Sequence, residues 1–233
     1  MADRRRRVFS HDAGAGAASV SRETGGRMQR RLIGLDLDNT IIDYERAFAP
    51  VAEEIGLIPK GTGLASKEEI KAVLRSTAGE EAWMRLQGQI YGHYIERATP
   101  YPGVIDFISA VISKGARVVI VSHKTRLGHF DTARIDLHEA ALGWLDRRGF
   151  FTRGGFDRRD VYFEETRSGK LARIAQTGCD IFVDDLPEIF HDPGFPKTAG
   201  KLWFAGDRPE DDGGGLKACR NWHQILDIVM SMP

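Results

Sequence analysis

The feature that most constrains the fold is an alternation of short apolar segments with amphipathic ones along most of the chain. Buried strands are predicted at residues 31–38, 117–122, 160–164, 180–185 and 201–204. Helical spacing of apolar residues appears at 104–114, 131–148, 167–177 and 221–230. Strands that alternate with helices form parallel sheets with helices on both faces. We therefore expect an α/β fold with a Rossmann-like parallel sheet.

Residues 44–99 interrupt this alternation. Helices are expected over 45–55, from a capping box at Ser66 and Glu69 to about residue 75, and over 80–97. The segment falls between the first two strands and is too long for a simple crossover. We predict a small α-helical cap subdomain at 44–99, inserted into a core domain made of residues 30–43 and 100–233.

Charge is distributed unevenly. The 233-residue chain has 33 Lys and Arg against 33 Asp and Glu, yet residues 1–31 hold eight Arg and three acids. Residues 1–29 are predicted to be a disordered basic arm. Met28 directly precedes the first strand, so residues 1–27 are either a flexible tail or the product of an upstream start-site artefact. The acidic balance of the remaining chain argues against a polybasic nucleic-acid binder.

The two cysteines, Cys179 and Cys219, are far apart and form neither a zinc pattern nor a disulfide framework. No apolar run approaches the ~20 residues that a membrane-spanning helix needs. The N-terminal segment also lacks the apolar stretch of a signal peptide. We expect a cytoplasmic protein without a membrane partner.

Acidic pairs end two of the apolar strands. Asp36 and Asp38 follow the first strand, and Asp184 and Asp185 follow the strand at 180–185. Ligands of open α/β sheets bind beyond the carboxyl ends of the strands. Four carboxylates at one sheet edge would repel each other unless a cation lay among them. Ligands that are all oxygen favour a hard cation, Mg²⁺ above all.

Two further polar residues are expected at the same edge. Ser122 ends the strand at 117–122, and Lys170 lies near the start of the helix that precedes Asp184. An edge with carboxylates, a hydroxyl, a lysine and a metal is suited to binding a phosphoryl group.

These residues resemble the four motifs of the haloacid dehalogenase (HAD) superfamily of hydrolases, in order. Residues 35–40 match its first motif, hydrophobic-D-x-D-x-T, and residues 119–122 match the second, a strand that ends in Ser or Thr. Lys170 resembles the third motif, and residues 183–185 resemble the acidic pair of the fourth. Residues 101–104 resemble the segment by which such chains re-enter the core after a cap. The likeness covers about residues 30–205.

The resemblance implies a role for each of these residues. Asp36 would be the nucleophile that forms an aspartyl-phosphate, and Asp38 the general acid and then the general base. Ser122 and Lys170 would bind phosphate oxygens. Thr40 is also assigned to the phosphate-binding set, with orientation of Asp38 as its expected contribution.

The resemblance also implies a metal site. Mg²⁺ would be held by Asp36, by the backbone carbonyl of Asp38, and by Asp184 with help from Asp185, whose direct ligation is left open.

The second Asp of the first motif favours phosphate esters over carbon–halogen bonds, because only an ester oxygen needs a proton as it leaves.

The sequence thus predicts an enzyme, a Mg²⁺-dependent phosphomonoester hydrolase acting on a small phosphorylated metabolite, with sugar phosphates as one candidate class. The alternatives are a phosphotransferase or phosphomutase, a non-catalytic binding module with this fold, and a nucleic-acid end phosphatase recruited by the basic arm. Tyr91, His93 and Tyr94 either line the pocket or pack between cap helices. His123 either touches the substrate or is a loop histidine with no role. The sequence makes no prediction of the oligomeric state.

Overall fold

The computed structural model describes residues 31–130, 132–206, 208 and 214–232. The basic arm predicted at residues 1–29 lies outside them. The described chain forms a six-stranded sheet in the order β5-β4-β1-β6-β7-β8, and every neighbouring pair is parallel. The strands are β1 (Leu32–Leu35), β4 (Arg117–His123), β5 (Val161–Glu164), β6 (Ile181–Asp184), β7 (Gly200–Phe204) and β8 (Ala218–Cys219). The predicted α/β fold with a Rossmann-like parallel sheet is confirmed.

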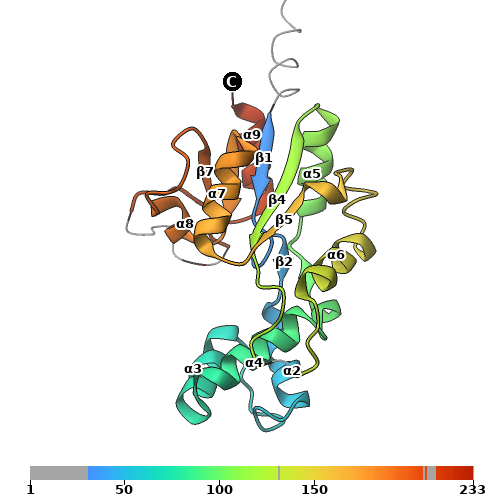
Figure 1. The fold of residues 1–233 in the computed structure, drawn as a ribbon, viewed down its shortest axis with the longest axis vertical. Coiled ribbons are helices and arrows are strands. Elements are labelled where there is room, and N and C mark those ends of the chain that lie inside the picture. Colours follow the sequence, from blue (N-terminus) through green and yellow to red (C-terminus); the bar gives the residue numbers. More distant parts are fainter. Residues whose placement is uncertain (1–30, 131, 207, 209–213, 233) are drawn as a thin grey trace, which may run out of the picture.

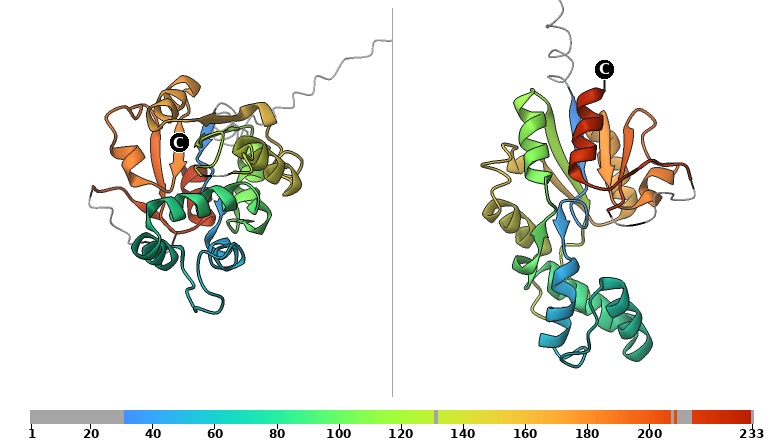
Figure 2. Two further views of the ribbon diagram at one scale, coloured as in Figure 1. Left: turned by 60° about the horizontal axis from the view of Figure 1, so that its bottom comes forward. Right: turned by 180° about the vertical axis from the view of Figure 1, so that it is seen from behind.

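Helices cover both faces of this sheet. The helices beside the sheet are α5 (Val104–Ser113), α6 (Leu137–Arg147), α7 (Arg167–Thr177), α8 (Pro187–His191) and α9 (Trp222–Ser231). α7 and α8 lie on the face seen in Figure 1, and α5 and α9 lie on the opposite face (Figure 2). None of the helices in the described part of the chain is both long and apolar enough to cross a membrane.

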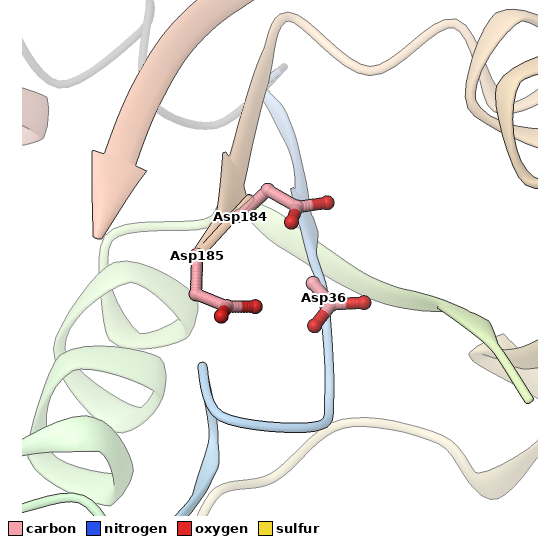
Figure 3. Close-up of side chains that lie close together, drawn as sticks. All are labelled: Asp36, Asp184 and Asp185. Carbon is pink, nitrogen blue, oxygen red and sulfur yellow. The ribbon is translucent and has the colours of Figure 1, made fainter. Parts of the chain in front are cut away.

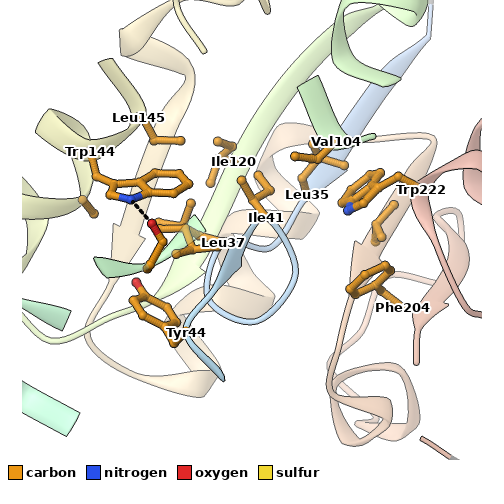
Figure 4. Close-up of a cluster of buried hydrophobic side chains, with 14 of the residues drawn as sticks. Leu35, Leu37, Ile41, Tyr44, Val104, Ile120, Trp144, Leu145, Phe204 and Trp222 are labelled. Atoms are coloured by element: carbon orange, nitrogen blue, oxygen red, sulfur yellow. Dashed lines mark hydrogen bonds between the residues drawn. The ribbon is translucent and has the colours of Figure 1, made fainter. Parts of the chain in front are cut away.

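The central strand β1 explains how the two faces are packed. Ile33 and Leu35 point into the larger apolar cluster, which includes Val104 and Trp222 from α5 and α9 (Figure 4). Gly34 faces the other way, as alternate residues of a strand do. A Cβ atom at Gly34 would lie 2.5 Å from the ring of Phe182, so only glycine fits there without a shift. The α7 side of β1 is therefore closed by Phe182 of β6.

The helical segment after β1 leaves and re-enters the core at one place. β2 (Ile42–Asp43) pairs antiparallel with β3 (Thr99–Pro100). Between them lie α2 (Glu45–Glu54), α3 (Lys67–Thr77), α4 (Gly79–Tyr91) and the short 3-10 helix η1 (Ile95–Arg97). These helices lie beyond the carboxyl ends of the strands (Figure 1). We call the α2–α4 segment the helical insertion.

Local sequence signals account for most helix boundaries. The Ser66 side chain caps α3 and the Glu69 side chain reaches back to the backbone of Ser66, so the predicted capping box is present. The helix expected at 131–148 begins only at Leu137. The Asp136 side chain accepts hydrogen bonds from the backbone N–H groups of His138 and Glu139, which fixes the start of α6 at that position. The expected 80–97 helix is divided, because α4 ends at Tyr91 before η1 begins.

Candidate active site

Three carboxylates meet at the carboxyl ends of β1 and β6. Asp36, Asp184 and Asp185 are all buried, and each offers an oxygen within 4.8 Å of the others (Figure 3). The pairing of the strands brings them together, since the Asp36 N–H donates to the Val183 carbonyl at 2.8 Å. We call Asp36, Asp184 and Asp185 the acidic cluster. Three of the four predicted metal ligands therefore lie together.

Lys170 completes this cluster from α7. Its side chain is only 2% exposed, and its Nζ lies 2.5 Å from Asp36 Oδ1 and 2.6 Å from Asp184 Oδ2. Burial lowers the pKa of Lys170, but the charges of Asp184 and Asp36 outweigh burial and raise the pKa above its ordinary value. The lysine is therefore a permanent positive charge beside Asp36.

The acidic cluster has more negative charge than Lys170 balances. Burial raises the pKa of Asp36 well above its ordinary value, and Asp184 and Asp185 add to the rise although Lys170 opposes it. Burial and the charge of Asp184 raise the pKa of Asp185 to about 7, against the opposing charge of Arg208. A divalent cation would relieve this repulsion. Because the donors are all oxygen, the residues fit Mg²⁺.

Thr40 joins the acidic cluster. Its hydroxyl lies 3.2 Å from Asp36 Oδ2 and 3.4 Å from Asp185 Oδ1. We expected Thr40 to orient Asp38, and the structure places its hydroxyl against Asp36 and Asp185 instead. The cause is the tight turn after β1, in which Asn39 has a positive φ of 60° and turns Thr40 back toward the strand end.

The Asp38 carboxylate lies apart from the acidic cluster. Its Oδ1 accepts a hydrogen bond from the Tyr44 hydroxyl at 2.7 Å, and its Oδ2 accepts one from Lys124 Nζ at 2.7 Å. Among the described residues, the group that could hold a metal through side chains does not include Asp38. The sequence led us to expect four carboxylates at one sheet edge, with Asp38 binding the metal through its backbone carbonyl. The structure brings three together and gives Asp38 different partners, while ligation through its backbone carbonyl stays a prediction.

Ser122 has an unusual environment. It is the next-to-last residue of β4, it is 1% exposed, and its Oγ has no hydrogen-bond partner among the described residues. A buried hydroxyl without a partner costs about 1–3 kcal/mol. The position therefore favours a bound group that accepts the hydroxyl hydrogen, as a phosphate oxygen does.

The residues that the sequence left open fall into two groups. Tyr91 is on α4 with its ring centroid 4.5 Å from that of Tyr44 and 4.5 Å from Lys124 Nζ. His123 is exposed, with its Nε2 3.2 Å from the Glu165 carbonyl. The Tyr94 hydroxyl donates to Glu54, and the His93 ring packs edge-on against Tyr94. Of this set, Tyr91 contacts Tyr44 and Lys124, the two partners of the Asp38 carboxylate.

Sequence reasoning missed Lys124, Tyr44 and Arg208. Lys124 follows Ser122 by two positions, so the alternation of a strand would have placed both side chains on one side. Arg208 lies 3.5 Å from Asp185 Oδ2, and Lys67 at the start of α3 lies 3.4 Å from Asn39 Oδ1. Neither contact has a local sequence signal, because each joins segments that are distant in the chain.

Comparison with known proteins supports the fold. No protein-family model matches the chain, and no curated protein matches it either. Among solved structures, the chain is similar to a putative phosphatase from Clostridium difficile, with 13% identity, TM-score 0.57, and coverage of 85% of this chain and 98% of that one. It is also similar to Protein Tyrosine Kinase A of Mycobacterium tuberculosis, with 15% identity, TM-score 0.55, and coverage of 87% and 98%.

A third similar structure is a HAD family hydrolase from Deinococcus radiodurans with bound phosphate and sodium. It has 13% identity and TM-score 0.54, and the match covers 85% of this chain and 94% of that one. The chain therefore has the fold of the HAD-superfamily hydrolases, as the motifs predicted. At these identities the similarity establishes the fold, and the chemistry depends on the residues described above.

Proposed function

We propose that this chain is a Mg²⁺-dependent phosphomonoester hydrolase that acts through an aspartyl-phosphate on Asp36. One observation carries the proposal: the Asp36 carboxylate lies beside Lys170 and two further buried carboxylates at the carboxyl end of a parallel sheet. A carboxylate with a permanent cation at 2.5 Å is arranged to meet a phosphate dianion.

The reaction has two displacements. In the first, a carboxylate oxygen of Asp36 forms a bond to phosphorus while the ester oxygen leaves and takes a proton from Asp38. In the second, Asp38 accepts a proton from water as the water oxygen attacks phosphorus. The bond to Asp36 then breaks, which releases inorganic phosphate and restores both carboxyl groups.

The other residues bind and orient. Asp36, Asp184 and Asp185 are the side chains that would hold Mg²⁺, which when bound neutralises charge between the carboxylate and the phosphate. Ser122 donates its free hydroxyl hydrogen to a non-bridging phosphate oxygen, and Lys170 offsets the charge of Asp36. Thr40 keeps the Asp36 carboxylate in place.

The substrate we propose is a small phosphorylated metabolite. We propose that the helical insertion is the cap subdomain expected at residues 44–99. Its side chains Lys67 and Tyr91 contact Asn39 and Lys124, at the edge of the site. These side chains are polar at their ends, which favours a hydrophilic leaving group such as a sugar. A cap that covers the substrate would exclude water until the aspartyl-phosphate has formed.

A phosphate-release screen over sugar phosphates, nucleotides and phosphorylated acids tests the proposal. We expect release from at least one class with Mg²⁺ and none after chelation. Asp36→Asn should remove the activity, whereas Asp106→Asn, an exposed acid on α5, should keep it. Turnover by Asp36→Asn at the wild-type rate would refute the mechanism, and inactivity of the wild type across the screen would refute the function.

Phosphoryl transfer is the second candidate. It would use the same Asp36 intermediate, with a substrate hydroxyl in place of water. The similarity in fold to a solved structure named as a tyrosine kinase supports keeping transfer as a candidate. A phosphorylated acceptor without an equal release of inorganic phosphate would favour transfer.

A further inference from the structure

A buried lysine contacts the predicted general acid. Lys124 is 3% exposed, and its Nζ lies 2.7 Å from Asp38 Oδ2. A buried ammonium is costly unless it is paired, and Asp38 is the acidic partner that the structure gives it. None of the four motifs requires a lysine at this position, and the steps proposed above do not use it.

The Lys124 backbone is held on two sides. Its N–H donates to the Glu164 carbonyl at 2.9 Å, which continues the pairing of β4 with β5. Its own carbonyl accepts a hydrogen bond from the Nε2 of His138 on α6 at 2.8 Å. The amine therefore projects toward Asp38 from a fixed point at the end of β4.

Tyr44 holds the other oxygen of the same carboxylate. It directly follows β2, its ring is fully buried, and its hydroxyl donates to Asp38 Oδ1 at 2.7 Å. Two donors that approach different oxygens from different segments fix both the position and the plane of the carboxylate. The ring of Tyr91 contacts both donors, because it lies 4.5 Å from Lys124 Nζ and 4.5 Å from the Tyr44 ring.

We infer that Lys124 and Tyr44 are positioning residues that hold the Asp38 carboxylate in the orientation needed for proton transfer, with Tyr91 of the helical insertion packed against both. This inference rests on the proposed function. A general acid must lie within hydrogen-bond reach of the leaving oxygen, so a freely rotating Asp38 would transfer the proton less efficiently.

Leaving-group dependence provides the test. The parameter kcat/KM reports on the steps up to the aspartyl-phosphate, and an alkyl leaving group needs a proton there while p-nitrophenolate does not. For Lys124→Met we expect kcat/KM to fall ~10²-fold with an alkyl phosphate and less than ~10-fold with p-nitrophenyl phosphate. Lys124→Arg, which keeps the donor charge, should recover part of the loss.

Two further variants protect the test against folding effects. Tyr44→Phe removes only a hydroxyl and should show the same selective loss, at about 10-fold. Lys201→Met removes an exposed lysine whose amine contacts the Phe190 carbonyl, far from Asp38 in the sequence and on the α8 side. This variant should change kcat/KM by no more than about twofold with either ester. Thermal denaturation should show that each variant is folded.

Several results would overturn the inference. If kcat/KM of Lys124→Met fell equally with both esters, Lys124 would be assigned to phosphate binding. A higher KM with unchanged kcat in the same variant would lead to the same assignment. An unchanged alkyl-phosphate rate in Tyr44→Phe and Lys124→Met would remove both residues from the reaction. A wild type inactive on both esters would reject the proposed function itself, a result distinct from an active wild type with indifferent variants.

Discussion

Asp36 and Asp38 are two positions apart, yet they lie in two different kinds of environment. Asp36 is surrounded by Asp184, Asp185 and Lys170, all supplied by the sheet and by α7. Asp38 is held by Lys124 and Tyr44, which come from the segments that follow β4 and β2. The first region has excess negative charge, and the second pairs one carboxylate with one lysine.

Strand geometry explains this difference. Asp36 follows the alternation of β1, so its side chain lies on the same side as Gly34, which faces Phe182 and α7. Lys170 of α7 can therefore reach the Asp36 carboxylate. Asp38 lies beyond the end of β1, where the turn has released the chain from the sheet. The first region therefore depends on the sheet and on α7, which packs beside it. The second depends on where the turn, the β4 end and the helical insertion meet.

The largest expected effect separates the two carboxylates by activity. Asp36→Asn should lower phosphate release about 10⁴-fold or more with every ester, because the proposed covalent intermediate forms on the Asp36 carboxylate. Asp38→Asn should lower kcat/KM far less with p-nitrophenyl phosphate than with alkyl phosphates. The same loss in both variants with both esters would show that the two carboxylates do not have separate roles.

Removal of a buried lysine should separate the two regions by stability. Lys170→Met leaves Asp36 and Asp184 without their cation, and we expect the free energy of unfolding to fall by about 3–5 kcal/mol without Mg²⁺. Added Mg²⁺ should restore part of that loss. In Lys124→Met, the Asp38 carboxylate keeps its hydrogen bond from Tyr44. The fall in the free energy of unfolding should therefore be smaller than for Lys170→Met, and Mg²⁺ should not change it. Denaturant titrations with and without the metal measure both effects.

The acidic cluster should also make stability depend on pH and on Mg²⁺. The folded pKa of Asp185 is raised to about 7, so its protonated form stabilises the fold at low pH. That contribution is lost as the pH rises toward and through about 7, and the raised pKa of Asp36 acts in the same direction. Without Mg²⁺ the melting temperature should therefore be lower at pH 8 than at pH 5.5.

Saturating Mg²⁺ should raise the melting temperature most at the higher pH, since a metal at 100 times its Kd adds about 2.7 kcal/mol to stability. Asp185→Asn should weaken both the pH dependence and the response to the metal. A melting temperature that rises with pH in the metal-free protein would contradict this account, as would a response to Mg²⁺ that Asp185→Asn leaves unchanged.

The smallest expected effect concerns Ser122. Its buried Oγ has no partner among the described residues, so Ser122→Ala should not lower the free energy of unfolding in the absence of ligand. Substrate affinity should nevertheless fall, because a donor to the phosphate is lost. A large loss of stability with unchanged KM would show that the hydroxyl has a structural role.

The parts of the site that lie on regular elements were predictable. The positions of Asp36, Asp184 and Ser122 follow from apolar strands that end at one sheet edge, and Lys170 follows from a helix that packs beside them. The contact between Lys124 and Asp38 joins residues 86 positions apart and depends on the path of the chain after β4. Likewise, the environment of Thr40 depends on the positive φ of Asn39, which strand periodicity does not predict.

The limits of the helices and strands also divide into those that a local sequence signal predicts and those that depend on distant parts of the chain. The capping box at Ser66 was readable because its two partners are three residues apart. The two-residue strand β8 and the five-residue helix α8 are too short for periodicity to show, so tertiary packing alone defines them. The start of α6 at Leu137 depends on the Asp136 side-chain cap, which apolar periodicity does not show.

The antiparallel pair β2–β3 has a consequence for how such proteins diversify. Ile42 pairs with Pro100 and Asp43 with Thr99, so the chain departs and returns through adjacent positions. A segment whose ends are fixed together can change in length at little entropic cost, since loop closure depends only weakly on loop size. We therefore expect the segment between Tyr44 and residue 98 to tolerate changes in length while the sheet register stays intact.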